Sequence, residues 1–136
     1  MSNFYTKSLV CNQLLSSNNN YDLIMVYRPD IVADELPNLN NFLLTKDIDK
    51  TVFIPNIYIF GHQGYNINDQ ICITNQKTIE IYLNIYNYID KYLNEDNILF
   101  HPETLLHYHL IKNNININFF EYNYNLNSKR HNIQNT

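Results

Sequence analysis

The sequence predicts an α/β domain in which a short mixed sheet is flanked by helices. Apolar runs of strand length occur near residues 22–27, 52–59, 70–74 and 115–121. Two segments between the third and fourth runs, 76–93 and 102–112, instead space apolar residues three or four apart, as one face of a helix does. Short strands that alternate with helices are typical of the α/β class.

The first half of the chain contains four predicted segments. Residues 3–16 place apolar side chains at mixed helical spacing, which predicts a short helix. The continuous apolar run 23–26 is typical of a strand covered on both faces. Residues 36–47 predict an irregular or briefly helical segment. The run 51–60 predicts a strand, and Pro55 within it indicates a sheet edge or a bend.

The clearest predicted element is the helix 76–93, for which Asn75 suits the N-cap. Its apolar stripe indicates core packing rather than a binding face, and it consists of Ile79, Tyr82, Ile85, Tyr86, Ile89 and Leu93. A second helix begins at Pro102, a residue that suits a first helical turn, and ends at Asn113. The run 115–121 first alternates apolar and polar residues, which is a strand pattern.

Composition bounds the class of protein. A chain of 136 residues suits one domain, expected over 1–126, with a polar C-terminal tail over 127–136. The net charge of −4 disfavours a nucleic-acid binder that relies on phosphate contacts, and the only basic cluster, 129–131, lies in the tail. Abundant asparagine, with Ile and Lys preferred over Val and Arg, is typical of an AT-rich genome such as that of a protist or a large DNA virus.

The cysteines and the absence of long apolar segments suggest a compartment. Cys11 and Cys72 lack metal-ligand spacing, and Cys72 lies in an apolar run, which predicts a buried reduced thiol. No stretch approaches the ~20 apolar residues of a membrane helix, and the N-terminus lacks a signal-peptide pattern. We therefore expect a soluble cytoplasmic protein, in the host cytoplasm if the source is viral. The only glycines, Gly61 and Gly64, concentrate backbone freedom in one loop, which is either a site or simply a connection.

Polar side chains gather at three ends of predicted elements, at residues 28–30, 68–69 and 101–103. Open α/β sheets bind ligands at the carboxyl ends of their strands. We therefore expect the carboxylates of Asp30 and Asp69, with His101 or Glu103, to border one cleft.

In order and spacing, these groups resemble the second half of small GT-A-like glycosyltransferases. Such sequences have a strand that ends in Arg-x-Asp, then Asn-Asp-Gln before a small strand and a helix, then Pro-Glu at the start of a helix. Here the three motifs read "YRPD", "NDQ" and "HPE", and the resemblance extends over residues 3–122. It implies transfer of a sugar from a nucleotide-sugar donor to a sugar or glycan acceptor, with a divalent metal cofactor, Mn²⁺ or Mg²⁺.

The resemblance assigns roles to the first motif. Asp30 corresponds to the acid that binds the metal ion and, through it, the donor diphosphate, since hard divalent ions prefer oxygen ligands. Arg28 corresponds to a donor- or phosphate-binding residue, because its planar fork favours bidentate contacts. The alternative for Arg28 is a salt bridge that braces the strand.

The resemblance also assigns roles to the second and third motifs. Asp69 corresponds to the carboxylate that takes the proton of the acceptor hydroxyl, and the alternative is a turn aspartate that bonds backbone amides. His101 corresponds to a metal or phosphate ligand, against the alternative of an ordinary loop histidine. Asn68 and Glu103 are supporting residues, and Glu103 also suits a helix start.

Two further histidines, His107 and His109, are two residues apart on the predicted helix. They therefore face different sides and make a poor metal pair.

The chain departs from these transferases at its start. They begin with a βαβ nucleotide-binding segment of ~100 residues or fewer, and this sequence begins at the helix before the metal-binding strand. The nucleotide pocket is therefore expected to be missing, and the chain alone is expected to show weak or no sugar transfer. We expect the exposed sheet edge beside 23–26 to form a homo-oligomer or a complex with a separate donor-binding chain. The alternatives are a non-catalytic interaction or assembly module and a metal-dependent hydrolase that uses the same acids.

Overall fold

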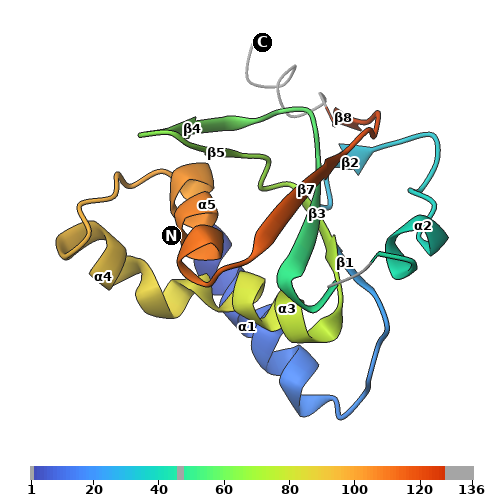
Figure 1. Ribbon diagram of the computed structural model, residues 1–136, viewed down its shortest axis with the longest axis horizontal. Coiled ribbons are helices and arrows are strands. Elements are labelled where there is room, and N and C mark those ends of the chain that lie inside the picture. The colour runs from blue at the N-terminus through green and yellow to red at the C-terminus, as the bar shows by residue number, and fades with distance from the viewer. Residues whose placement is uncertain (1, 46–47, 128–136) are drawn as a thin grey trace.

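A four-stranded mixed sheet forms the centre of the computed structural model, which describes residues 2–45 and 48–127 (Figure 1). The strand order is β1–β6–β3–β7; β6 runs antiparallel to both β1 and β3, and β7 runs parallel to β3. The strands are β1 (Ile24–Tyr27), β3 (Thr51–Pro55), β6 (Ile71–Thr74) and β7 (Asn116–Phe120). The predicted α/β class with a short mixed sheet is confirmed, and all four predicted strands belong to that sheet.

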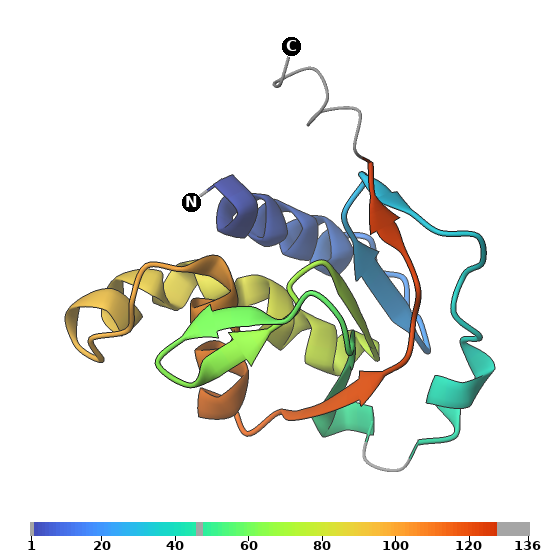
Figure 2. The same cartoon turned by 90° about the horizontal axis from the view of Figure 1, so that it is seen from above.

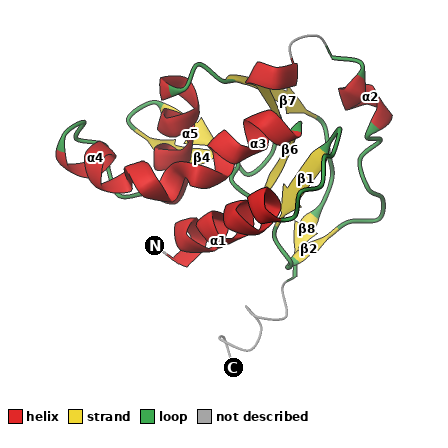
Figure 3. Ribbon diagram, turned by 90° about the horizontal axis from the view of Figure 1, so that it is seen from below, coloured by secondary structure: helices red, strands yellow, loops and turns green. Residues whose placement is uncertain are grey.

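Most of the helices lie on one side of this sheet, and α2 lies on the other (Figures 1 and 3). The first group comprises α1 (Ser2–Ser16), α3 (Gln76–Leu83), α4 (Ile89–Asn94) and α5 (Pro102–Lys112). On the far side are α2 (Asn40–Leu43) and the chain that follows β7. The predicted helices 3–16 and 102–112 are confirmed, as is the brief helix within 36–47.

The two central strands, β3 and β6, are buried on both faces, which explains their largely apolar sequences. Val52, Ile54 and Cys72 join the core beneath the helices. Phe53 and Ile73, which are directly paired across β3 and β6, join a second core on the other face. Since successive side chains of a strand point to opposite faces, a strand buried on both sides must be apolar at every position.

The predicted helix 76–93 is interrupted, and its expected continuity is wrong. A 3₁₀ turn, η2 (Asn84–Tyr88), separates α3 from α4. Asparagine, isoleucine and tyrosine in η2 have modest helix propensity, and the Asn84 side chain lies 3.1 Å from Nε2 of His109 in α5. The predicted N-cap is confirmed, because Asn75 accepts a hydrogen bond from the backbone N–H of Thr78 at 3.0 Å.

The glycine loop is a β-hairpin that the sequence did not predict. It consists of β4 (Phe60–His62) and β5 (Tyr65–Ile67), and it extends from the sheet alongside α5 (Figure 2). Gly64 occupies the tip with φ of +80°, a conformation that glycine adopts without strain. The backbone N–H of His62 donates to Thr104 Oγ1 at 2.7 Å, which fastens the hairpin to the start of α5.

Pro55 marks a bend rather than a sheet edge. It is the last residue of β3, which lies between β6 and β7. The predicted strand over 52–59 therefore ends there, and Tyr58 beyond it has φ of +52°. A two-residue pairing of β2 (Ile31–Val32) with β8 (Asn125–Leu126) was too short to predict from periodicity.

Both cysteines are buried free thiols, as predicted for Cys72. Within the described residues, no helix combines the length and apolar character that crossing a membrane requires. Apart from Asn127, the predicted C-terminal tail lies outside the described residues, and so does its basic cluster at 129–131.

Candidate functional site

The pairing of β1 with β6 brings two of the three predicted motifs to one end of the sheet. Tyr27, the last residue of β1, is the partner of Ile71, the first residue of β6. The backbone N–H of Arg28 donates to the carbonyl of Gln70 at 3.2 Å, which extends the ladder by one pair. Residues 28–30, which follow β1, therefore lie at the same end of the sheet as Asp69, which precedes β6.

Arg28 and Asp30 form a bidentate ion pair. Arg28 Nε donates to Asp30 Oδ1 at 3.0 Å, and Nη2 donates to Oδ2 at 2.7 Å. The Arg28 side chain is 47 % exposed, so the pair contributes only about 0–1 kcal/mol to stability. Because a guanidinium carries five N–H donors and Asp30 uses two, Arg28 keeps donors for an anionic ligand.

Asn68 and Gln70 are structural parts of a buried network. Asn68 Nδ2 donates to the carbonyl of Ile57 and to the hydroxyl of Tyr124, each at 2.7 Å. The Tyr124 hydroxyl donates to Gln70 Oε1 at 2.8 Å, and the Gln70 backbone N–H donates to Asn68 Oδ1 at 2.7 Å. Asp69 alone of the Asn-Asp-Gln motif is half-buried rather than buried.

Asp69 receives its side-chain contact from α1, which sequence reasoning did not include in the site. Asn3 Nδ2 donates to Asp69 Oδ2 at 3.4 Å, and Lys7 Nζ donates to Asn3 Oδ1 at 2.6 Å. Lys7 is only 7 % exposed. Burial lowers the pKa of its ammonium group, an effect that the negative charge of Asp69 opposes. The missed signal was a lysine on the helix stripe that also carries Phe4 and Cys11.

The third motif forms the start of α5. His101 is the N-cap, with Nδ1 3.4 Å from the backbone N of Thr104, from which it accepts, and 3.3 Å from Glu103 Oε2. Its ring packs edge-on against His62 at 4.6 Å. Pro102 and Glu103 occupy the first turn, where a proline fits and a carboxylate is favoured by the helix dipole.

Charges from all three motifs influence the pKa of the Lys7 ammonium group: Asp69 and Glu103 raise it, whereas Arg28 lowers it. The contact of Asp69 with α1, through Asn3, is a direct one. The roles of these charged residues in binding or catalysis remain predictions.

This arrangement does not fit a divalent metal ion directly. Both Asp30 oxygens already accept from Arg28, and His101 Nδ1 caps α5. Nowhere in residues 2–45 and 48–127 do three His, Cys, Asp or Glu side chains group closely enough to hold a metal ion. His107 and His109 have different neighbours: the first packs against Tyr65, and the second lies 2.6 Å from the Tyr92 hydroxyl.

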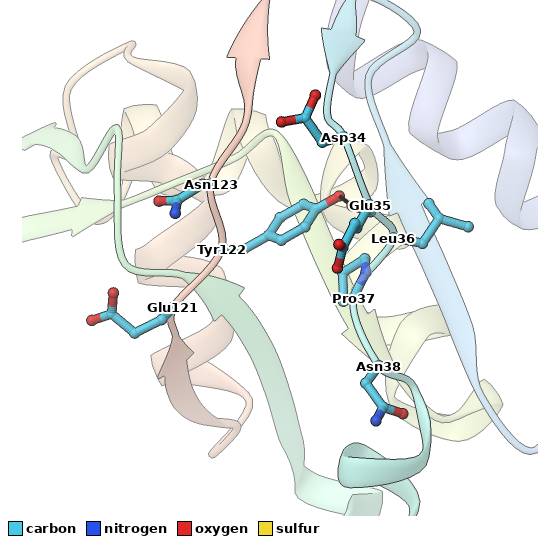
Figure 4. Close-up of a pocket in the computed structure, with 8 residues that line it drawn as sticks. All are labelled: Asp34, Glu35, Leu36, Pro37, Asn38, Glu121, Tyr122 and Asn123. Carbon is cyan, nitrogen blue, oxygen red and sulfur yellow. Dashed lines mark hydrogen bonds between the residues drawn. The ribbon is translucent and has the colours of Figure 1, made fainter.

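A surface groove lies elsewhere, between the segments 34–38 and 121–123 (Figure 4). Its volume is about 400 Å³, and none of the predicted site residues lines it. The Tyr122 side chain crosses between the two segments and donates to the backbone oxygen of Glu35 at 2.6 Å. Three carboxylates line the groove, those of Asp34, Glu35 and Glu121, but acidic residues alone do not identify a ligand.

Comparison of the chain with protein-family models, with curated proteins and with solved structures found no match.

Proposed function

We propose that this chain is a glycosyltransferase-like domain that acts where β1 ends and β6 begins. The observation that carries the proposal is the β1–β6 register, which sets Arg28 opposite Gln70 and so brings the Arg-Pro-Asp and Asn-Asp-Gln motifs to one end of the sheet. Lys7 and Glu103 add further charges at that place. A site with both cationic donors and a half-buried carboxylate suits a diphosphate and a hydroxyl group together.

The proposed reaction uses groups of the protein itself. The N–H donors of Arg28 that Asp30 leaves free would contact the donor diphosphate. The acceptor hydroxyl oxygen would attack the anomeric carbon and form the new C–O bond while its proton passes to the Asp69 carboxylate. The bond between the anomeric carbon and the diphosphate oxygen would break, and the nucleoside diphosphate would leave with the electron pair.

Isothermal titration calorimetry of the purified chain tests the binding step. UDP-glucose and GDP-mannose would be titrated with and without Mn²⁺, since the cation requirement is itself part of the expectation. Because the βαβ nucleotide-binding segment is expected to be missing, we expect the chain alone to bind one of these probes only weakly, through its diphosphate, and Arg28→Gln to abolish that binding. The matched control is Lys91→Gln, which removes a positive charge from the exposed surface of α4 and should leave affinity unchanged.

Sugar release from the bound probe tests the role of Asp69. Asp69→Asn should keep nucleotide-sugar affinity and lower transfer, or hydrolysis to water, about 10²- to 10⁴-fold, the usual contribution of a general base. Glu121→Gln makes the same charge change in the remote groove and should retain the wild-type rate. Equal loss in both variants, or no binding by the wild-type chain, would reject the transferase.

An interaction or assembly module is the second candidate. The observation that favours it is the position of β1, which pairs only with β6 among the described strands and forms one edge of the sheet. The Asp30 carboxylate engaged by Arg28 is equally compatible with a structural ion pair. A stable partner complex together with the absence of nucleotide-sugar affinity would favour this candidate.

A further inference from the structure

Lys7 occupies a position that is unfavourable for an ammonium group. Phe4, Lys7 and Cys11 are three and four residues apart, so they share the face of α1 that packs on the core, and each is less than 8 % exposed. Moving a charged amine from water into such surroundings costs free energy unless the charge is compensated. An apolar residue would suit this face better for packing alone.

The compensation that Lys7 finds is incomplete. Its Nζ donates to Asn3 Oδ1 at 2.6 Å and lies 5.9 Å from the ring centres of Phe4 and Tyr82, at the outer limit of a cation–π contact. Among the described residues, no carboxylate oxygen lies within 4.0 Å of this ammonium. The hydroxyl of Tyr82 is also buried and has no hydrogen-bond partner in the described part of the chain.

Asn3 joins the buried cation to the candidate base. Its amide oxygen accepts from Lys7, and its amide nitrogen donates to Asp69 Oδ2 at 3.4 Å. The two charges determine this orientation, because a reversed amide would turn its NH₂ group toward the ammonium and its oxygen toward the carboxylate. Both contacts come from the first turns of α1, whose positive dipole end also favours an anion.

We propose that Lys7 and Asn3 are positioning residues that hold the Asp69 carboxylate by one oxygen, so that its other oxygen faces the acceptor hydroxyl. The inference rests on the proposed function, since it specifies how the base of that reaction is oriented. Asp69 Oδ1 has no hydrogen-bond partner within the described residues, which leaves it available to accept a proton. Neither positioning residue needs to touch the substrate.

The charged groups around the Lys7 side chain determine how its pKa would change in a titration. The charged or titratable groups that influence Lys7 are Asp69 and Cys72 at β6, Glu103 on α5 and Arg28 beyond β1, and the Tyr82 ring of α3 lies 5.9 Å from its Nζ. Burial lowers the pKa of Lys7 most strongly; Asp69, Cys72 and Glu103 oppose that decrease, whereas Arg28 adds to it. Loss of the Asp69 charge should therefore lower the pKa of Lys7 further.

NMR titration of the Lys7 ε-methylene group tests the coupling without any sugar ligand. We expect the midpoint to shift to lower pH in Asp69→Asn and to stay at the wild-type value in Glu121→Gln. Three-bond couplings should also show that the Asp69 side chain, fixed in one χ1 rotamer in the wild type, averages over rotamers in Asn3→Ala and Lys7→Met. Lys7→Met keeps the length and packing of the side chain, and circular dichroism checks that each variant is folded.

The outcomes separate this inference from the proposed function. An unchanged Lys7 midpoint in Asp69→Asn, or an Asp69 rotamer that persists in both α1 variants, would overturn the positioning role even if the chain binds nucleotide sugars. If the chain transfers sugar, Lys7→Met should lower kcat while leaving KM unchanged. A lysine without a role in positioning the base would leave kcat unchanged in the folded variant. Absence of nucleotide-sugar binding would reject the transferase, and the assignment of Lys7 to its base would fail with it.

Discussion

Nδ1 of His109 lies 2.6 Å from the hydroxyl oxygen of Tyr92 and links the centre of α5 to α4. The other ring nitrogen, Nε2, lies 2.7 Å from the carbonyl of Ile81 and 3.1 Å from Asn84 Oδ1. His109 has no exposed surface. A neutral ring that donates from Nε2 to the Ile81 carbonyl and accepts at Nδ1 from the Tyr92 hydroxyl satisfies both of these hydrogen bonds. Burial accordingly lowers the pKa of His109.

This buried histidine predicts that acid destabilises the fold. Below the ordinary histidine pKa of about 6.5, the unfolded chain binds a proton that the folded chain does not, so the free energy of unfolding falls as pH falls. The decrease should begin near that pH and continue down to the lower pKa of folded His109. Urea denaturation from pH 7.5 to 5 measures it, and His109→Leu should flatten the slope. An equal slope in the variant would contradict the assignment.

The same substitution should also lower stability at neutral pH. Removal of the imidazole leaves the Tyr92 hydroxyl and the Ile81 carbonyl without their buried partner, which should lower the free energy of unfolding by about 1–3 kcal/mol. His107→Gln is the control, since His107 is only half-buried and packs against Tyr65. A larger loss of stability in His107→Gln than in His109→Leu would show that α5 depends on His107 instead.

Tyr124→Phe should destabilise the network that holds the Asn-Asp-Gln motif. The change removes the hydroxyl that accepts from Asn68 and donates to Gln70, both buried, at an expected loss of about 1–3 kcal/mol. Tyr27→Phe removes the hydroxyl of a 59 % exposed side chain and should change stability by less than about 0.5 kcal/mol. Thermal unfolding of both variants compares them, and equal stability would argue against the network.

Gly61→Ala should disrupt the hairpin. A β-carbon at Gly61 would lie 1.8 Å from the backbone oxygen of Tyr65, so the two strands must separate, at a loss of about 3 kcal/mol. Gly64→Ala meets no atom within 4 Å and suffers only from φ of +80°, which costs about 1–2 kcal/mol. Chemical denaturation should rank Gly61→Ala as the less stable variant; the reverse order would be inconsistent with the hairpin pairing.

The edge strand β1 predicts association with another strand. Residues 23–26 are only half-buried, and Tyr27 at the end of β1 is 59 % exposed. Unpaired strand edges invite pairing, so sedimentation velocity should show self-association at high concentration, and Tyr27→Lys should weaken it. Leu44→Lys adds the same charge at an 85 % exposed position near α2 and should behave as the wild type does. A monomeric wild-type chain would exclude self-association through β1.

Much of the fold was predictable because it depends on neighbours in the sequence. The N-cap Asn75 and the first-turn residue Pro102 act within a single helical turn, and the structure confirms both. The apolar run 23–26 predicted a strand covered on both faces; the strand is confirmed, but it lies at the edge of the sheet and its residues are only half-buried. Hydrophobic periodicity and capping are short-range properties, so they can be read from short stretches of sequence.

The hairpin and the break in the helix depended on contacts that short stretches do not contain. His62 is fastened to Thr104, and Asn84 lies beside His109, in each case across more than 20 residues. Such contacts form only when α5 packs against both segments. Propensity within 60–67 or 84–88 could not predict them, because packing overrides weak local preferences.

The sequence by itself determined where the main strands and helices form and which polar motifs stand at their ends. Only the tertiary structure decided that β6 lies between β1 and β3, so that Arg28 meets Gln70, and that α1 brings Lys7 and Asn3 to Asp69. Strand order and helix docking are set by the free energy of packing the whole chain, which no local pattern records. The positions of the candidate site's charges relative to one another are therefore a property of the folded domain.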